Sequence, residues 1–346
     1  MAAETPQKIC LLRLSAIGDT CNVVPTVRQL QKAFPNCSIT WIIGAVEHRL
    51  LGSFPGVEFI TVDKTDSKKA ARKLRKQIKS VQYDVLLHMH ASMRANLVSR
   101  HIRAHRKIGF DRGRARDFQW LFCKESIEAK QNSHVVDGFL QFAEHLGVAT
   151  QPPQWNLAIA PEAADFARRY TRKPSLIISP CSSDRRQNFR NWSIENYIRL
   201  ARYATDEFGL QVILTGGPTD LEKDYGQRIG AEAAVTNLIG NTSLPQLLAL
   251  LQQARVVVCP DSGPAHMANA VNTPVVGLFA TSNRFRTGPY RSQDFAADRY
   301  PDAVEKYLHK TVDEVRWGQR VRDPDAMSLI TFDDVAAQLG KVMQVK

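Results

Sequence analysis

Short apolar runs alternate with amphipathic stretches in the first half of the chain. Runs rich in β-branched and other apolar residues are typical of buried strands, and they cover residues 9–14, 38–44, 57–62 and 83–88. A further short strand is predicted at 106–109. Apolar residues at helical spacing predict helices over 19–34, 66–80 and 134–146. Strands that alternate with helices in this way predict a parallel sheet with helices on both of its faces.

The same alternation begins again after the composition changes at Gln151-Pro152-Pro153 and a helix at 162–170. Further strands are predicted at 175–179, 211–215, 237–239, 255–259 and 274–278. Further helices are predicted at 194–208, 220–231, 244–253, 262–271 and 333–342. The sequence therefore predicts an α/β protein of two domains, 1–160 and 161–346, which we expect to face each other across a cleft.

Composition is that of a soluble globular protein. The chain has 346 residues, of which 44% are hydrophobic and 23% are charged, and no apolar run has the ~18 residues that a membrane span needs. The first residues lack the charged and apolar regions of a secretory signal. The six cysteines lie far apart without a Cys-x-x-Cys pair, which disfavours a disulfide framework or a cysteine zinc site. We expect a cytoplasmic protein.

The net charge of +12 is concentrated in one segment. Residues 64–116 hold 16 Lys and Arg against three Asp, whereas the rest of the chain is close to neutral. Such a segment predicts an anionic partner, which is a nucleic acid, a phosphorylated glycolipid or a membrane surface. For residues 68–79 a solvated helix face is an equally good explanation.

The first strand-to-helix turn contains a carboxylate at the sheet edge where ligands of α/β proteins bind. This turn, residues 13–19, reads Arg-Leu-Ser-Ala-Ile-Gly-Asp, so it lacks the G-x-G-x-x-G fingerprint of dinucleotide-binding proteins. Asp19 fits two hypotheses, a general base directed into the cleft or a cap of the following helix.

Three turns in the second domain suit a phosphate or a nucleotide. Pro180-Cys181-Ser182-Ser183 is followed by Arg185, Arg186 and Arg190, so hydroxyl, N–H and guanidinium groups come together. Gly216 and Gly217 after the next strand would let a base or ribose come close to the backbone, or form an ordinary turn. Asp261-Ser262-Gly263 opens a helix whose N–H groups suit a diphosphate, while Asp261 and His266 also fit a cap and a packed side chain.

The sequence offers little for other chemistries. Asp323 and Asp325 form the only Asp-x-Asp, outside the sheet pattern, and no H-E-x-x-H is present, so we expect no bound metal. His88 and His90 end a strand, and packing or solvation is the favoured explanation for both. Serine hydrolases and P-loop enzymes are disfavoured because neither G-x-S-x-G nor G-x-x-x-x-G-K-[ST] occurs.

Together these motifs resemble glycosyltransferase family 9, the ADP-heptose:lipopolysaccharide heptosyltransferases. The resemblance runs from about Lys8 to Tyr290 and includes residues 12–19 with Pro25, and the three turns of the second domain in order. Residues 282–290 look most like the branch that adds the first heptose to phosphorylated Kdo. The family implies the GT-B fold of two facing Rossmann-like domains, an N-terminal one for the acceptor and a C-terminal one for the nucleotide sugar.

The resemblance also implies a role for each matched residue. Asp19 would deprotonate the acceptor hydroxyl in an inverting transfer that needs no metal. The groups that would hold ADP-heptose are Ser182, Ser183, Arg190, Gly216, Gly217, Asp261, Ser262, Gly263 and His266. Many relatives have Lys where this chain has Arg190, which leaves open whether Arg185, Arg186 or Arg190 contacts the diphosphate.

With this resemblance, the basic segment acquires a natural partner. Arg94, Arg112, Arg114 and Arg116, with Lys107, would meet phosphates of Kdo-lipid A, and the segment would also contact the anionic cytoplasmic face of the inner membrane. Three alternatives remain: a GT-B transferase of another nucleotide sugar, a non-catalytic binder of anionic polymers, and an NAD-dependent oxidoreductase. Nucleic acid is disfavoured because Tyr83 and Phe110 are the only aromatic residues of the segment. The oxidoreductase is disfavoured by the missing glycine fingerprint.

Overall fold

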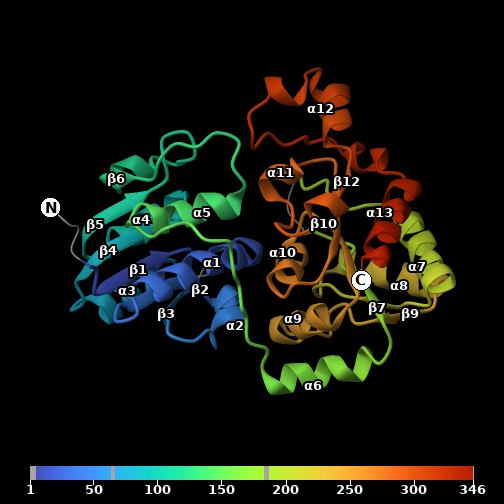
Figure 1. Cartoon of the computed structure of the whole chain (residues 1–346), viewed down its shortest axis with the longest axis horizontal. Helices are drawn as coiled ribbons and strands as arrows, with labels where there is room; N and C mark the ends of the chain where they lie inside the picture. Colours follow the sequence, from blue (N-terminus) through green and yellow to red (C-terminus); the bar gives the residue numbers. More distant parts are fainter. Residues whose placement is uncertain (1–4, 64–66, 183–186, 346) are drawn as a thin grey trace. The chain divides into compact units, whose positions relative to one another are not determined.

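The computed structural model describes residues 5–63, 67–182 and 187–345. The chain divides into two compact units, Met1–Ala158 and Ile159–Lys346, called unit 1 and unit 2 below. Within the described ranges each unit holds one sheet of six strands with helices around it, and Figure 1 colours unit 1 from blue to green and unit 2 from green to red.

The sheet of unit 1 is wholly parallel, with the strand order β3-β2-β1-β4-β5-β6. Its strands are β1 (Lys8–Leu12), β2 (Ser38–Gly44), β3 (Glu58–Val62), β4 (Tyr83–His88), β5 (Ala104–Gly109) and β6 (Glu125–Ser126). The central strands are apolar along most of their length because both faces are buried, as in β1, where only Lys8 is exposed. This order is that of the doubly wound Rossmann sheet.

Helices cover both faces of this sheet. They are α1 (Ile17–Ala33), α2 (Ala45–Leu51), α3 (Ser67–Ile78), α4 (Met93–Ser99) and α5 (Val135–Glu144), with the short 3₁₀ helix η1 (Gln119–Leu121). Cys10 and Leu12 of β1 share one core cluster with residues of α3 and α4. On α1, which packs against α5, the Cys21 carbonyl accepts the indole N–H of Trp155 (2.9 Å), so the segment after α5 is fastened to unit 1.

Unit 2 repeats the strand order of unit 1. Its parallel sheet has the order β12-β11-β10-β7-β8-β9. The strands are β7 (Ser175–Ile178), β8 (Gln211–Leu214), β9 (Val235–Asn237), β10 (Val256–Pro260), β11 (Val275–Phe279) and β12 (Ala297–Asp298). The three central strands, β7, β10 and β11, are buried along their whole length, which is why they are continuous apolar runs in the sequence.

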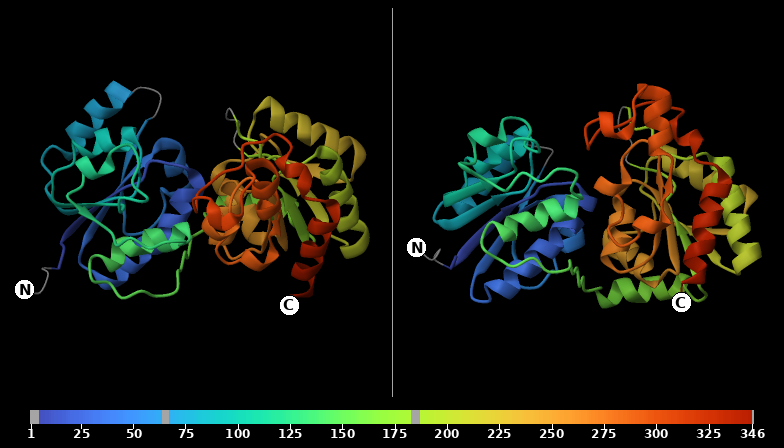
Figure 2. Two further views of the ribbon diagram at one scale, coloured as in Figure 1. Left: turned by 90° about the horizontal axis from the view of Figure 1, so that it is seen from above. Right: turned by 45° about the horizontal axis from the view of Figure 1, so that its top comes forward.

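Local sequence signals define the helices of unit 2. These helices are α6 (Pro161–Tyr170), α7 (Ile194–Phe208), α8 (Asp220–Glu232), α9 (Leu244–Gln253), α10 (Gly263–Ala270), α11 (Arg284–Thr287), α12 (Tyr300–Leu308) and α13 (Phe332–Gln344). The short 3₁₀ helices are η2 (Gln293–Phe295), η3 (Val312–Glu314) and η4 (Ala326–Leu329). Helix α7 starts at the cap Ser193 and ends at Gly209, whose φ of 62° favours glycine. The last helix, α13, packs beside α7 in both views of Figure 2.

Most predicted elements are confirmed to within a few residues, and the differences have physical causes. The strand predicted at 237–239 is wrong in position, because β9 is the edge strand Val235–Asn237 and the apolar Leu238 and Ile239 are buried just beyond it. Helices α2, α4, α11 and α12 were not predicted, and each of them has fewer than ten residues. Since the strands of each sheet run parallel, the turns that follow them gather at one edge of that sheet.

Candidate active-site edges of the two sheets

Asp19 lies in the first turn of α1, just beyond the carboxyl end of β1. Its carboxylate accepts the N–H of Ala16 (3.2 Å) and forms an ion pair with Arg13. The side chain of Asp19 is 39% exposed, whereas that of Arg13 is 12% exposed. Asp19 therefore fits both hypotheses from the sequence, since it helps to cap α1 and also presents an accessible carboxylate.

Arg13 holds this carboxylate in a fixed orientation. Its Nη1 donates to the carbonyl of Met89 after β4 (2.7 Å), and its guanidinium lies 5.3 Å from the centre of the Phe139 ring. Next to it, the N–H of Leu14 donates to Nδ1 of His90 (3.1 Å). The turn after β1 is thus hydrogen-bonded to the turn after β4, and these contacts hold the ion pair of Arg13 and Asp19 in place.

His88, at the end of β4, is a packed residue, as favoured from the sequence. It is fully buried, and Gln119 Nε2 lies 2.8 Å from its carbonyl and 3.1 Å from its Nδ1. Burial, the largest cause, lowers the pKa of His88 to about 3, so the imidazole is neutral near neutral pH.

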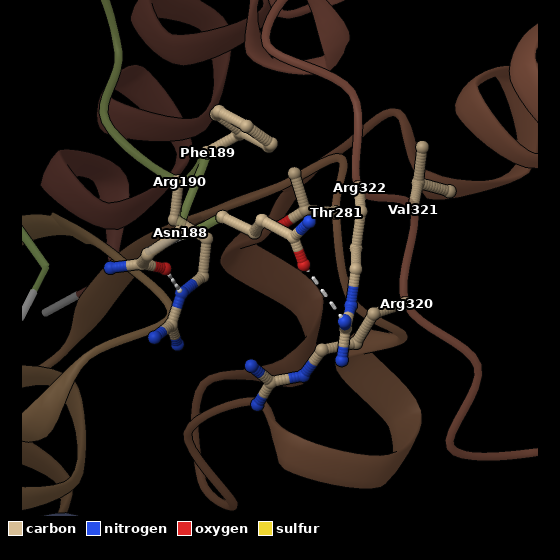
Figure 3. Close-up of a pocket in the computed structure, with 8 residues that line it drawn as sticks. Asn188, Phe189, Arg190, Thr281, Arg320, Val321 and Arg322 are labelled. Carbon is tan, nitrogen blue, oxygen red and sulfur yellow. Dashed lines mark hydrogen bonds between the residues drawn. The ribbon is translucent and has the colours of Figure 1, made fainter. Parts of the chain in front are cut away.

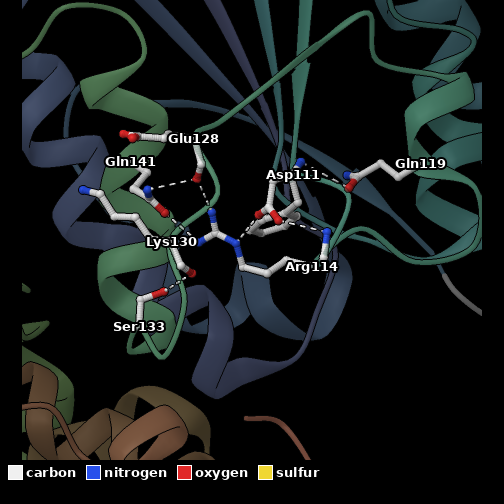
Figure 4. Close-up of polar contacts among 9 residues, drawn as sticks. Asp111, Arg114, Gln119, Glu128, Lys130, Ser133 and Gln141 are labelled. Atoms are coloured by element: carbon white, nitrogen blue, oxygen red, sulfur yellow. Dashed lines mark hydrogen bonds and ion pairs between the residues drawn. The ribbon is translucent and has the colours of Figure 1, made fainter. Parts of the chain in front are cut away.

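Arg114, one of the predicted acceptor-binding residues, is engaged within unit 1. Its guanidinium forms an ion pair with Asp111 and donates to Gln141 Oε1 (2.6 Å) and to the Glu128 carbonyl (2.7 Å). Figure 4 shows Arg114 between these groups, which come from three separate segments of the unit. The structure therefore gives Arg114 a bracing position, and its donors are directed at the protein.

The other three predicted acceptor-binding arginines differ from Arg114. Arg94 on α4, Arg112 and Arg116 are all exposed. The Arg112 guanidinium stacks on the Trp120 ring at 4.6 Å from its centre. These three side chains present their charge to solvent on the part of unit 1 that follows β4 and β5.

Exposed apolar side chains accompany these arginines. Met93 and Leu97 on α4 are 41% and 49% exposed, and Phe118 and Leu121 are 56% and 74% exposed. The two segments are joined, because Asp117 accepts the Met93 N–H (2.8 Å) and its carbonyl accepts from Asn96 Nδ2 (2.6 Å). We call Met93, Leu97, Phe118 and Leu121 the apolar patch.

In unit 2, Ser182 lies in the turn after β7 and is held by two asparagines. Its N–H donates to Asn191 Oδ1 (2.8 Å), and its hydroxyl accepts from Asn188 Nδ2 (2.7 Å). Ser183, Arg185 and Arg186 lie outside the described residues. Among the three candidate arginines, Arg190 is the one that the structure describes.

Arg190 joins the turn after β7 to the turn after β10. Its Nη1 donates to the Asp261 carbonyl (2.5 Å) and lies 3.4 Å from Asp261 Oδ2. Ser282 Oγ donates to the same carboxylate oxygen (2.8 Å). The structure therefore brings Arg190 and Asp261 together, which are 71 residues apart in the chain, and sets Ser282 beside them.

In the turn after β8, both glycines lie against a carboxylate of the following helix, which fits the ordinary turn that the sequence left open. A Cβ on Gly217 would lie 2.8 Å from Oε2 of Glu222, and the Gly217 N–H donates to Glu222 Oε1 (2.6 Å). Thr219, which caps α8, also donates to this carboxylate (2.6 Å), and Gly216 lies against it as well. Glu222 was missed in the sequence, although Thr219 and Glu222 have the spacing of a capping box.

The turn after β10 leads into α10. Ser262 is its N-cap, yet the Ser262 side chain makes no hydrogen bond to the N–H groups of its own helix, unlike the caps Ser193, Thr219 and Ser243. Gly263 is the first residue of α10, and His266 in the same helix is 8% exposed. The first N–H groups of α10 are thus not capped by Ser262 and carry the positive end of the helix dipole.

A cavity of about 130 Å³ adjoins Arg190 in unit 2. It is lined by Gln187, Asn188, Phe189, Arg190, Thr281, Arg320, Val321 and Arg322. Figure 3 shows the guanidinium groups of Arg190, Arg320 and Arg322 on one side of this set. Arg320 and Arg322 were missed because they lie beyond the strand and helix pattern, although the order Arg-Val-Arg around a buried Val321 places both on one face.

Two further expectations concern metals and membranes. Asp323 Oδ1 accepts the N–H of Asp325 (2.8 Å), so this pair forms a turn. Over the residues described, no group of three or more His, Cys, Asp and Glu side chains is arranged to hold a metal ion. None of the helices in the described ranges is long and apolar enough to span a bilayer.

Two Rossmann-like units, each with ligand-suited turns at the carboxyl edge of a parallel sheet, form the architecture of the GT-B class of glycosyltransferases. Residues 71–310 match the sequence profile described as glycosyltransferase family 9 (heptosyltransferase). The lipopolysaccharide core heptosyltransferase OpsX of Haemophilus influenzae is 37% identical over 343 residues, 98% of each chain. The chain belongs to glycosyltransferase family 9, and the enzyme class expected from the sequence is confirmed.

Solved structures agree on the fold. A family 9 glycosyltransferase from Veillonella parvula superposes with a TM-score of 0.78, at 21% identity and 98% coverage of each chain. The E. coli heptosyltransferase WaaC with ADP gives 0.74, at 17% identity, covering 97% of this chain and 99% of that one. A more distant neighbour (0.53, 12% identity, 99% and 78% coverage) is the iron-containing dodecameric glycosyltransferase TibC of enterotoxigenic E. coli.

Proposed function

We propose that the protein transfers heptose from ADP-heptose to Kdo of phosphorylated Kdo-lipid A, in the inner core of lipopolysaccharide. The observation that carries the proposal is the 37% identity to a lipopolysaccharide core heptosyltransferase along nearly the whole of both chains. The WaaC structure with ADP, which has the same fold, supports ADP as the nucleotide of the donor. We propose that unit 1 binds the acceptor and unit 2 binds the donor.

In the proposed reaction, Asp19 is the general base. Its carboxylate takes the proton of the acceptor hydroxyl while that oxygen attacks the anomeric carbon of heptose, and the bond from this carbon to the diphosphate oxygen breaks. ADP leaves with the bonding electrons, and the anomeric configuration inverts. The exposure of Asp19 and its ion pair with Arg13 support this role, since the carboxylate is both reachable and oriented.

Positive groups of unit 2 are proposed to stabilise the departing diphosphate. Arg190 and the N–H groups of Ser262 and Gly263 at the start of α10 supply this charge without a metal ion. Ser182 would add a hydroxyl to this group, and His266 lies on α10 itself. Asp261 positions Arg190 through the contacts described above. Gly216, Gly217 and Glu222 are proposed to lie at the ribose of the donor, because the Glu222 carboxylate is suited to accept from ribose hydroxyls.

The acceptor is proposed to meet the exposed arginines of unit 1. Arg94, Arg112 and Arg116 are suited to the phosphates of Kdo-lipid A because guanidinium groups pair with phosphate oxygens through two hydrogen bonds. Arg114 is proposed to support this region through Asp111 and Gln141. The single role expected for all four arginines thus becomes two.

We also propose that this region of unit 1 touches the cytoplasmic face of the inner membrane, where the lipid acceptor resides. The apolar patch supports the proposal, because it holds four of the eight large hydrophobic side chains that are exposed among the described residues. Exposed apolar side chains next to exposed arginines are the combination that binds an anionic lipid surface. The protein would then act as a peripheral cytoplasmic enzyme.

Mass spectrometry of the product tests the function. The purified full-length protein is incubated with Kdo-lipid A and, in separate samples, with ADP-heptose, ADP-glucose or UDP-glucose. The proposal predicts that the acceptor gains one heptose from ADP-heptose alone. Transfer from another donor would favour the alternative, a transferase of a different nucleotide sugar. No transfer from any donor would contradict the proposed function.

Flotation with vesicles tests the membrane contact. We expect binding to vesicles rich in anionic phosphatidylglycerol and little to vesicles of phosphatidylcholine. A Leu97→Ser and Leu121→Ser double variant should bind several-fold more weakly, whereas the control Leu221→Ser, an exposed leucine of unit 2, should bind like the parent. Equal binding of the double variant and the parent would remove the apolar patch from the interface.

A further inference from the structure

We propose that Arg320 and Arg322 complete a phosphate-binding cavity with Arg190 and take the diphosphate of a nucleotide ligand. The inference rests on the proposed function, in which unit 2 binds a nucleoside diphosphate sugar. It assigns a role to two residues that lie beyond residue 310, where the match to the family profile ends.

The cavity has the size and lining that an anion requires. Its volume of about 130 Å³ is well above the ~10–15 Å³ that a single water needs, so it has room for a larger polar group. Three of its eight lining residues are arginines, and Thr281 and Asn188 add polar groups. Guanidinium groups are the side chains best suited to bind phosphate oxygens two at a time.

The backbone that carries Arg320 and Arg322 is held in place. Residue 320 forms an antiparallel bridge with Ser282, and the Val321 N–H donates to the Thr281 carbonyl (3.1 Å). The Val321 side chain is buried, and the Tyr300 hydroxyl donates to the carbonyl of Gln319, the residue before Arg320 (2.9 Å). The two arginines therefore project from a fixed strand-like segment, which lowers the entropy cost of binding a ligand.

The charges around the cavity are unbalanced. Arg190 lies against Asp261, but within the described ranges no Asp or Glu oxygen comes within 4.0 Å of a side-chain nitrogen of Arg320 or Arg322. Arg322 Nη1 donates to the neutral Gln187 Oε1 (3.1 Å). Like charges that line one cavity repel each other, and a bound anion converts that repulsion into attraction.

The position of the cavity points to a diphosphate. Arg190 lines the cavity and also donates to the carbonyl of Asp261, the residue directly before the N-cap of α10. One phosphate group at the cavity would thus lie near the helix start proposed for the leaving group. Arg320 and Arg322 would then bind the donor and stabilise the negative charge that the diphosphate gains as it departs.

Calorimetric binding of ADP and of adenosine to the full-length protein tests the cavity. Arg320→Ala and Arg322→Ala should each weaken ADP binding about tenfold, a moderate value because both side chains are exposed, and should leave adenosine binding unchanged. The matched control is Arg316→Ala, an exposed arginine of the same segment that does not line the cavity, and it should bind ADP like the parent.

ADP affinities within twofold of the parent in both variants would overturn the proposal. So would an equal loss for adenosine, since the arginines would then not act on the phosphates, or a parent that binds ADP no more tightly than adenosine. The outcome for the proposed function is separate. A parent that binds ADP through these arginines but transfers no heptose refutes the function and leaves the cavity in place.

Discussion

Replacing Arg114 by alanine should destabilise unit 1 locally, which distinguishes Arg114 from its exposed neighbours. The side chain of Arg114 is 24% exposed and that of its partner Asp111 is 11% exposed, so water reaches the ion pair only in part. The substitution leaves Asp111 with the Gly113 N–H (2.9 Å) and removes the Arg114 donor from Gln141 Oε1. The Glu128 carbonyl keeps its bond from Gln141 Nε2 (3.2 Å).

The magnitude follows from these contacts. Loss of the charged partner of Asp111 costs about 2 kcal/mol. Gln141 is only 3% exposed, so leaving its Oε1 without the Arg114 donor costs about 1 kcal/mol more. The guanidinium also lies 5.9 Å from the centre of the Phe110 ring, a small further contribution. The expected loss is about 3 kcal/mol.

Hydrogen exchange on the full chain, read by mass spectrometry, measures this loss where it occurs. Amides of α5, which carries Gln141, should exchange about 100-fold faster in Arg114→Ala, whereas amides of α7 in unit 2 should not change. Arg116→Ala removes an exposed arginine of the same segment and is the control, with an expected change below about 0.5 kcal/mol. If α5 exchanges alike in the two variants, Arg114 is not a brace.

Three further predictions concern pH, the acceptor and metals. Because burial lowers the pKa of His88 to about 3, the unfolded chain binds a proton below pH ~6.5 that the folded chain does not. The free energy of unfolding therefore falls by about 1.4 kcal/mol per pH unit below pH 6.5 because of this group. In urea unfolding at several pH values, His88→Gln should lose this part of the pH dependence. An unchanged pH dependence would mean that His88 is not buried in its neutral form. Changing Arg94, Arg112 and Arg116 together to Gln should raise the KM for Kdo-lipid A and leave the KM for ADP-heptose nearly unchanged, and added salt should weaken acceptor use more than donor use; equal effects on both substrates would leave a merely solvated face. Activity should survive EDTA, since Arg190 and the start of α10 supply the charge at the diphosphate, and loss on chelation with recovery on adding a metal ion would contradict this.

The fold could be predicted largely because both sheets are buried on two faces, which makes central strands such as β1 and β10 continuous apolar runs. Edge strands carry less of this signal. In β9, Thr236 and Asn237 are polar and partly exposed, and the buried Leu238 and Ile239 that follow attract the prediction instead.

The candidate site was predictable only where it follows a strand. The turns with Asp19, Ser182 and Asp261 each come directly after a central strand, so the topology alone brings the last two to one edge. The three arginines of Arg-Gly-Arg-Ala-Arg look equivalent in sequence, and what separates Arg114 from the others is the tertiary position of Asp111 and Gln141. The role of Arg320 could not be predicted from the sequence either, because the residues that line the cavity with it are distant in the chain.

The most direct test of the account is heptose transfer by Asp19→Asn, with ADP affinity measured on the same sample. Asparagine keeps an oxygen that can accept the Ala16 N–H and cap α1, but it cannot take the proton of the acceptor hydroxyl. We predict that transfer to Kdo-lipid A falls by about 100- to 10,000-fold while the Kd for ADP stays near that of the parent. Near-normal transfer by Asp19→Asn would contradict the account and leave Asp19 as a helix cap.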